Sequence, residues 1–286
     1  MRRATTAWLS LAPGLLVSAC ITWLLLAALP RAAASASLLA GVAASCALGL
    51  GVGERSAASV LLMTRRPRPD ELDDLVPALT LLCRAGLGPP LVELRVRRGV
   101  AITTGGAGRR TVLVSTGLLD AIAAGDLPPD QAAALLIHAA ARVRAGAHRH
   151  ELLLTWLAGP WLALRAVARA GSARAHRRLP VLAAAWRLRA VVLVIAVAQA
   201  VAASHLWLAC GIVVLGACSY STPALEQRRS AALVALGDTS VVDTGLAPAL
   251  AAFLRRCGPD PANRTRLRAL ERAQPRRSLL GPVLRP

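Results

Sequence analysis

The sequence has no lysine, and all 34 of its basic residues are arginine. Aromatic residues make up only 3% of the 286 positions, and the 15 acidic residues leave a formal charge of +19. In a soluble protein such a charge would indicate nucleic-acid binding, but no aromatic residues are interleaved with the basic runs to stack on bases. We therefore expect no nucleic acid among the partners.

The sequence also lacks paired cysteines. Its six cysteines contain no C-x-x-C pair, and their spacing fits neither a zinc knuckle nor a disulfide framework. We expect them to be reduced, buried and packed as small apolar residues.

Apolar residues are abundant, at 55% of the chain, and the mean hydropathy is +0.52. This composition predicts insertion into a lipid bilayer. A first apolar run, Ala7 to Leu29, is long enough to cross a bilayer, and a second, Ala36 to Val52, follows after a short loop. We interpret the two as a transmembrane helical hairpin. A signal peptide is the alternative for the first run, because two arginines precede it and Ala-Ser-Ala follows near position 35.

Arginine is dense before the first apolar run and after the second, and only Arg31 lies between them. The positive-inside rule then predicts a multi-pass protein of the cell membrane with its N-terminus and everything after Arg55 in the cytoplasm. Two later apolar segments, 152–164 and 191–218, leave the number of crossings open. The second of these is long for one span and short for two.

The part that follows the first hairpin has a mixed pattern. Asp70 to Arg84 repeats apolar residues at helical spacing. Three short stretches, Leu91 to Val96, Val100 to Thr104 and Thr111 to Ser115, favour β-structure, and glycines 105, 106 and 108 are typical of turns. We predict a small antiparallel sheet in a mainly helical domain.

A longer helix is predicted from Pro128 to about Gly146, with His138 in its middle. In H-E-x-x-H zinc peptidases, two histidines four positions apart bind the metal and the glutamate is the general base. Here the five positions are His138, Ala139, Ala140, Ala141 and Arg142. The first ligand position is present, alanine stands at the base position, and arginine stands at the second ligand position.

Other motifs occur in a defined order around this helix. They are Val100 to Gly106 (VAITTGG), Val112 to Leu119 (VLVSTGLL), Glu226 to Ala232 (EQRRSAA) with Leu236-Gly237, and Asp260-Pro261 with Arg264, Arg266 and Leu267. In this order they resemble the HtpX-type membrane zinc metallopeptidases over roughly residues 5 to 272. BlaR-type sensor peptidases share part of the pattern and are the nearest rival, supported by His148-Arg149-His150.

The resemblance implies an α+β membrane protein: an N-terminal transmembrane helical hairpin, a mainly helical cytoplasmic zincin-like domain with a small antiparallel sheet, and a second apolar hairpin. It implies metal ligands at His138 and Glu226. The corresponding segments are residues 1–63 (first hairpin), 64–150 and 220–274 (two parts of the peptidase-like domain), 151–219 (second, membrane-associated hairpin) and 275–286 (tail).

The departures from the motif weaken the zinc site. A catalytic zinc needs three protein ligands and an open position, whereas Arg142 brings a positive charge and Ala139 cannot accept a proton. We therefore expect no cofactor, zinc being the metal if one binds. We expect instead an ion pair between Arg142 and Glu226, with His138 hydrogen-bonded beside it.

These observations favour a catalytically inactive pseudopeptidase of the membrane that acts as a scaffold or regulator. An active membrane zinc metallopeptidase with a non-standard site and a membrane protein unrelated to peptidases remain the alternatives.

Overall fold

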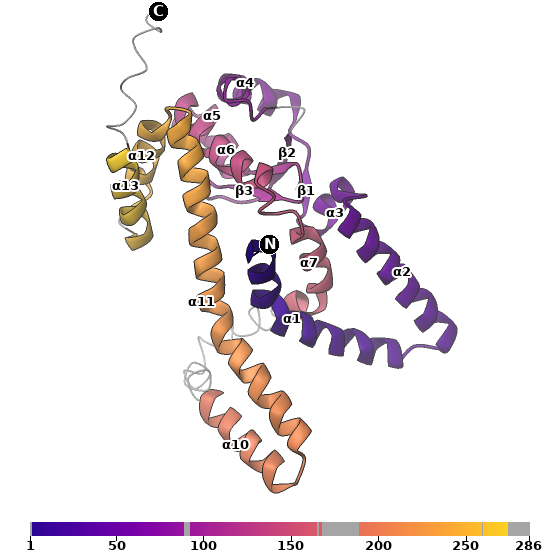
Figure 1. The fold of residues 1–286 in the computed structure, drawn as a ribbon. Helices are drawn as coiled ribbons and strands as arrows, with labels where there is room; N and C mark the ends of the chain where they lie inside the picture. Colours follow the sequence, from indigo (N-terminus) through magenta and orange to yellow (C-terminus); the bar gives the residue numbers. More distant parts are fainter. Residues whose placement is uncertain (1, 89–91, 165, 168–188, 259, 274–286) are drawn as a thin grey trace, which may run out of the picture. The chain divides into compact units, whose positions relative to one another are not determined.

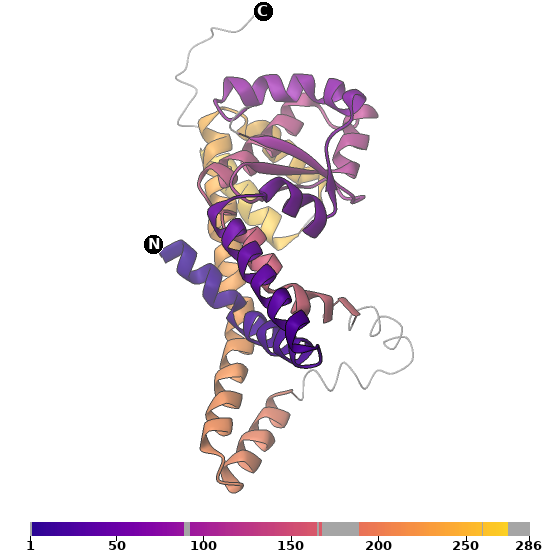
Figure 2. The same cartoon turned by 90° about the vertical axis from the view of Figure 1, so that its right-hand side faces the viewer.

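The computed structural model describes residues 2–88, 92–164, 166–167, 189–258 and 260–273. The chain divides into two compact units, each built from two separate segments. Unit 1 comprises Met1–Cys46 and Leu153–Ser230, and unit 2 comprises Ala47–Leu152 and Ala231–Pro286. The described residues are mainly helical (Figures 1 and 2). The predicted tail, 275–286, lies outside the described residues.

Unit 1 is helical throughout its described part. It contains α1 (Arg2–Ala27), most of α2 (Arg31–Leu50), most of α7 (Glu151–Leu157), α10 (Arg189–Ala202) and the first part of α11 (Leu206–Asp243). Figure 1 shows α10 and the start of α11 as an antiparallel pair. Gly216 allows this approach, because a Cβ there would lie 3.1 Å from the side chain of Leu193.

Among the described residues, α2 is the one helix whose length and apolar composition suffice to cross a membrane; Gly14–Ala27 and Ala190–Ala202 are apolar but shorter. No residue of α2 is buried. Large apolar side chains are also exposed elsewhere in unit 1, including Trp23, Leu24, Leu25, Val192, Val194 and Trp207. These helices therefore have apolar faces that the described chain does not cover.

The described cysteines differ from expectation in their burial. Five of them are free, in agreement with the reduced state expected, but all five are exposed: Cys20, Cys46, Cys83, Cys210 and Cys257. The prediction that they are buried was wrong, because three of them lie on the uncovered helices of unit 1.

Unit 2 combines a four-stranded sheet with helices. Its elements are α3 (Glu54–Leu61), β1 (Thr64–Arg65), α4 (Pro69–Arg84), β2 (Glu93–Arg97), β3 (Thr104–Ala107), β4 (Thr111–Ser115), α5 (Thr116–Ala123), α6 (Pro129–Arg144), the end of α11, α12 (Ala247–Arg256) and α13 (Pro261–Ala273). The helix predicted over 70–84 is confirmed as α4. It begins at Pro69, and the Glu71 carboxylate accepts a hydrogen bond from the Arg68 backbone N–H at 2.7 Å, which satisfies one free donor at the helix start.

The sheet is mixed, with strand order β1-β2-β4-β3, and the prediction of an antiparallel sheet was wrong. Strands β3 and β4 form an antiparallel hairpin, as expected of strands joined by a glycine turn. The correction concerns β2, which pairs with β4 in parallel, from Glu93 opposite Thr111 to Arg97 opposite Ser115. The three strands alternate in direction along the chain, but β4 lies between β2 and β3, so two strands of the same direction become neighbours.

Strand β3 also differs in position, because it contains Gly105 and Gly106, which we had assigned to a turn, and excludes Val100 to Thr103. A Cβ on Gly106 would lie 2.5 Å from both Val143 and His148. The strand can therefore pass close to α6 only where it has no side chain.

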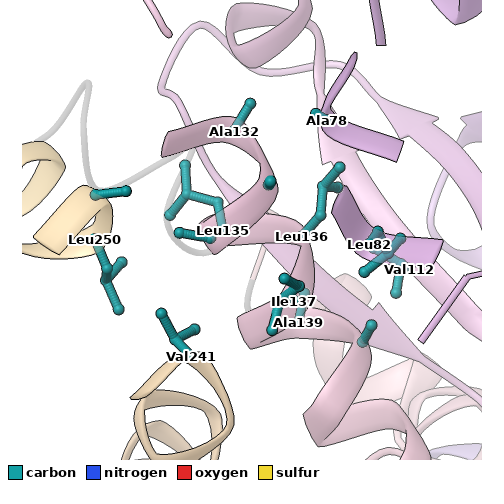
Figure 3. Packing of buried hydrophobic residues seen from close by; sticks show 14 of the residues in the cluster. Ala78, Leu82, Val112, Ala132, Leu135, Leu136, Ile137, Ala139, Val241 and Leu250 are labelled. Atoms are coloured by element: carbon teal, nitrogen blue, oxygen red, sulfur yellow. The ribbon is translucent and has the colours of Figure 1, made fainter. Parts of the chain in front are cut away.

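Helix α6 lies at the centre of unit 2. Residues from Gln131 to Ala141 are all buried, which is typical of a helix covered on every side. It packs against α4, α5, α12, β3 and β4. Figure 3 shows this packing, with Leu136 toward Ala78 and Leu82 of α4, and Leu135 toward Leu250 of α12.

Strand β4 is buried on both faces. Val112 and Val114 belong to the main apolar core with α6, whereas Leu113 belongs to a smaller cluster with Ala58 of α3 and Leu152. The loop before β4 also anchors α3 and the end of α2. The Arg109 backbone N–H donates a hydrogen bond to the Glu54 carboxylate at 3.0 Å, and the Arg109 side chain donates one to the Gly49 carbonyl at 2.9 Å. The sheet thus connects α6 on one face to α3 on the other.

Candidate functional site

Helix α6 presents His138 from a rigid position. Pro129 at the first position and Asp130 in the first turn favour the start of the helix, and Arg142 and Arg144 in the last turn suit its C-terminal end. Gly146 then takes φ of 70°, which ends the helix shortly after Arg144. Because the helix is buried on all sides, the imidazole cannot turn toward solvent without disturbing the core.

The His138 imidazole packs against α11. Its Nε2 atom lies 3.4 Å from Oδ1 of Asp238, and the residue is only 7% exposed. A Cβ on Gly237 would lie 2.3 Å from Cδ2 and 2.4 Å from Nε2 of the ring. The absence of a side chain at Gly237 therefore makes room for the histidine between the two helices.

Asp238 is held from its other side by α13. Arg266 donates two hydrogen bonds to it, from Nε to Oδ2 at 3.0 Å and from Nη2 to Oδ1 at 2.7 Å. This two-point pairing is the strongest arrangement of a guanidinium and a carboxylate, and it fixes the orientation of both groups. Asp238 thus links three helices: α6 through His138, its own helix α11, and α13 through Arg266.

The pKa of His138 is lowered from 6.5 to about 4. Burial is the main cause, and the positive charges of Arg266 and Arg142 act in the same direction. Asp238 and a hydrogen bond to the backbone of Val234 oppose the shift without overcoming it. At neutral pH the imidazole is therefore uncharged.

The other motif positions on α6 have different surroundings. Ala139, at the general-base position, is 1% exposed and belongs to the apolar core (Figure 3). Arg142, one helical turn after His138, is close enough to lower its pKa. The backbone of Glu226 belongs to α11, but its side chain lies outside the described residues. The ion pair between Arg142 and Glu226 therefore stays a prediction.

The part of α11 that faces His138 comprises Val234, Gly237 and Asp238. Val234 follows Glu226 by eight positions, which is about 12 Å along a continuous helix. Sequence reasoning missed Asp238 altogether. Arg266 was noted only as part of a C-terminal motif. The signal that could have found the pair is Asp238 itself, because an aspartate in an otherwise apolar helix segment indicates that a cation lies nearby.

His148 and His150 do not extend the site along α6. The helix ends at Arg144, and His148 lies in the following turn, where its Nδ1 pairs with the carboxylate of Glu151. His148 is also in the position that Gly106 leaves free. We infer a role for His148 in packing the chain between α6 and α7.

The donor set around His138 does not fit a catalytic zinc ion. His138 and Asp238 could supply two ligands, but both oxygens of Asp238 already accept hydrogen bonds from Arg266. Within the described ranges no group of three or more His, Cys, Asp and Glu side chains could hold a metal. The charges of Arg266 and Arg142 would also repel a divalent cation.

No family model matches the chain, and neither the curated proteins nor the solved structures contain a match. The class that the fold itself defines is a mainly helical protein with a small mixed sheet beside a buried, histidine-bearing helix.

Proposed function

We propose that this chain is a membrane protein with a non-catalytic, peptidase-like domain that acts as a scaffold or regulator. The observation that carries the proposal is the two-point pairing of Arg266 with Asp238 beside a neutral His138. The carboxylate that a metal would need next to the imidazole is already paired with a guanidinium. The site then connects α6, α11 and α13 without supplying a Lewis acid or a general base, since Ala139 lies in the core.

Membrane insertion is supported by the surface of unit 1. The apolar helix α2 has no buried residue, and large apolar side chains of α1, α10 and the first part of α11 are also exposed. A soluble protein rarely exposes so many large apolar side chains on neighbouring turns of its helices, whereas lipid would cover them. The arginines that follow α2 favour a cytoplasmic position for unit 2.

An active zinc peptidase is the second candidate, and one observation favours it. The Nε2 atom of His138 is buried and has no hydrogen-bond partner among the described residues, although it faces the carboxylate of Asp238 at 3.4 Å. A metal ion between the two groups would satisfy that nitrogen if Arg266 moved away from the carboxylate.

Metal analysis of the purified, detergent-solubilised chain separates the two candidates. We expect far less than one zinc per chain after dialysis against a zinc-containing buffer, and no proteolysis that a chelator abolishes. As a control, Arg266→Gln should admit more metal if charge repulsion is what excludes it. About one zinc per chain with chelator-sensitive proteolysis in the wild type would refute the non-catalytic function.

A further inference from the structure

A second polar site lies on the opposite side of unit 2 from the main core, where α3, β1 and β2 meet. It is a shallow, largely open cavity of about 480 Å³ lined by Arg55, Ser56, Ser59, Thr64, Arg65, Arg66 and Arg95. All seven lining residues are arginine, serine or threonine. Such a lining offers hydrogen-bond donors and positive charge, and it has the size of a small-molecule site.

The innermost arginine, Arg95, is only 5% exposed. Its Nη1 donates to the hydroxyl of Ser59, and its Nη2 lies 3.4 Å from a carboxylate oxygen of Glu93. Its Nε is buried and has no hydrogen-bond partner among the described residues. The protein thus leaves the Arg95 guanidinium only partly satisfied, and the charge of an anion in the cavity would lower the cost of burying it.

The charges around the cavity do not balance. Four arginines line it, and two carboxylates pair with them: Glu93 with Arg55 and Arg95, and Glu71 with Arg65. Four positive charges less two negative charges leave two in excess. Because guanidinium forks match the oxygens of a phosphate group, the excess favours a phosphate-type anion over a halide.

The position of the cavity in the chain also favours a phosphate-type anion, because it follows the apolar helix α2 closely. Helix α2 ends at Leu50, and the first lining residue, Arg55, follows after four residues. The last residues of α2 belong to unit 2, and the Gly49 carbonyl accepts a hydrogen bond from Arg109 there. If α2 lies in a bilayer, the cavity is close to the level of the lipid head groups.

We propose that this cavity binds a phosphate mono- or diester anion through Arg55, Arg66 and the buried Arg95. The anion is either the phosphate of an anionic lipid head group or a soluble phosphate. Anion binding does not depend on the proposed pseudopeptidase function, because the cavity contains none of the residues around His138, but the lipid as source rests on the proposed membrane insertion.

The test compares two double variants of the full chain in detergent micelles. Arg55→Gln with Arg66→Gln removes two exposed charges from the cavity, and Arg149→Gln with Arg268→Gln removes two exposed charges elsewhere in unit 2. One probe is inorganic phosphate, measured by the thermal unfolding midpoint against chloride at equal ionic strength. The other is phosphatidylglycerol, measured by mass spectrometry as lipid retained after solubilisation from vesicles of equal parts phosphatidylcholine and phosphatidylglycerol.

We expect the cavity variant to bind its anion about tenfold more weakly than the wild type, and the control variant to differ by less than about twofold. Retention of phosphatidylglycerol without an effect of phosphate identifies the lipid as the source, and a phosphate effect alone identifies a soluble ligand. If both double variants lost the same amount of binding affinity, the effect would come from general surface charge and the proposed site would be overturned. A wild type that binds neither phosphate nor phosphatidylglycerol would overturn it as well. If the cavity variant does not fold, Arg66→Gln alone serves, since that side chain is exposed.

Discussion

Arginine has opposite roles in two regions of unit 2. At the His138 site, Arg266 forms a two-point pair with one carboxylate and lies within a contact between helices. In the cavity at α3, β1 and β2, four arginines share two carboxylates, and a buried N–H of Arg95 is left over. In the first region the charge of Arg266 is matched by a carboxylate, whereas the cavity keeps an excess of positive charge.

This difference shows that the high arginine content does not have a single cause. A paired guanidinium orders neighbouring helices, and removing it should cost folding stability. A guanidinium with an unsatisfied N–H costs folding stability itself, and an external anion would offset that cost. The two regions should therefore respond in different ways when charges are removed.

The largest effect is expected for Arg266→Leu. The carboxylate of Asp238, whose side chain is 14% exposed, would lose both hydrogen bonds, and we expect a loss of about 3 kcal/mol in the free energy of unfolding. Thermal unfolding of the detergent-solubilised chain measures this loss. Arg268→Leu, an exposed position on the same helix, should change stability by less than about 0.5 kcal/mol. If the two variants were equally stable, the ion pair would not connect the helices.

Gly237→Ala should destabilise by about 2 kcal/mol, because its Cβ would overlap the buried His138 ring and force α6 and α11 apart. Gly211→Ala is the matched control in the same helix, where a Cβ meets nothing within 4 Å, and it should be neutral or slightly stabilising. Adding His138→Ala should relieve the overlap and restore part of the stability. A Gly237→Ala protein as stable as the control would mean that the ring does not occupy this position.

The low pKa of His138 predicts a loss of stability on acidification. Above pH 6.5 the histidine is neutral in both the folded and the unfolded chain and contributes nothing. Between pH 6.5 and about 4 the unfolded chain takes up a proton that the folded chain does not, so stability falls across this range and then stays nearly constant below pH 4. His138→Gln should flatten this part of the curve of stability against pH. An unchanged slope in the variant would assign the loss to other groups.

The smallest effect is expected at the edge of the arginine cavity. Arg65 and the Arg68 backbone N–H lower the pKa of Glu71 from 4.5 to about 2, so the carboxylate stabilises the fold above pH 4.5 and loses this contribution as the pH falls toward 2. Glu71→Gln should therefore cost about 1 kcal/mol at pH 7 and almost nothing at pH 2. The exposed Asp74→Asn on the same helix should have no such difference. A cost that did not vary with pH would point to lost packing instead of lost charge.

Local patterns predicted the helices well. The starts and ends of α4 and α6 follow from Pro69, Pro129, the acidic first turns and the glycines that come after them, all of which act within one or two turns. The sheet was predicted less well. The residues of β4 were right, but its place between β2 and β3 depends on contacts between segments distant in sequence. The predicted position of strand β3 was wrong because Gly106 makes room for Val143 of α6 and does not form a turn.

The candidate site shows the same limit. His138 was predicted from its motif. Its partner Asp238, and the Arg266 that pairs with Asp238, were not predicted, because they lie about 100 residues or more further along the chain. A buried carboxylate needs a cation, and this argument was applied to Glu226 and Arg142. The structure satisfies the requirement at Asp238 with Arg266. Physical chemistry thus predicted the kind of interaction, whereas the identity of the pair depends on how α11 and α13 meet.

The position of Arg266 near the C-terminal end of the described chain has a consequence for biosynthesis. Both α6 and α11 emerge from the ribosome before α13, and chains begin to fold from the N-terminal side. In the nascent chain His138 then faces the carboxylate of Asp238 without the guanidinium, which favours a protonated imidazole. When α13 docks, Arg266 lowers the proton affinity of His138. Docking of α13 and protonation of His138 therefore oppose each other, so the assembled arrangement of α6, α11 and α13 should become less favourable as the pH falls.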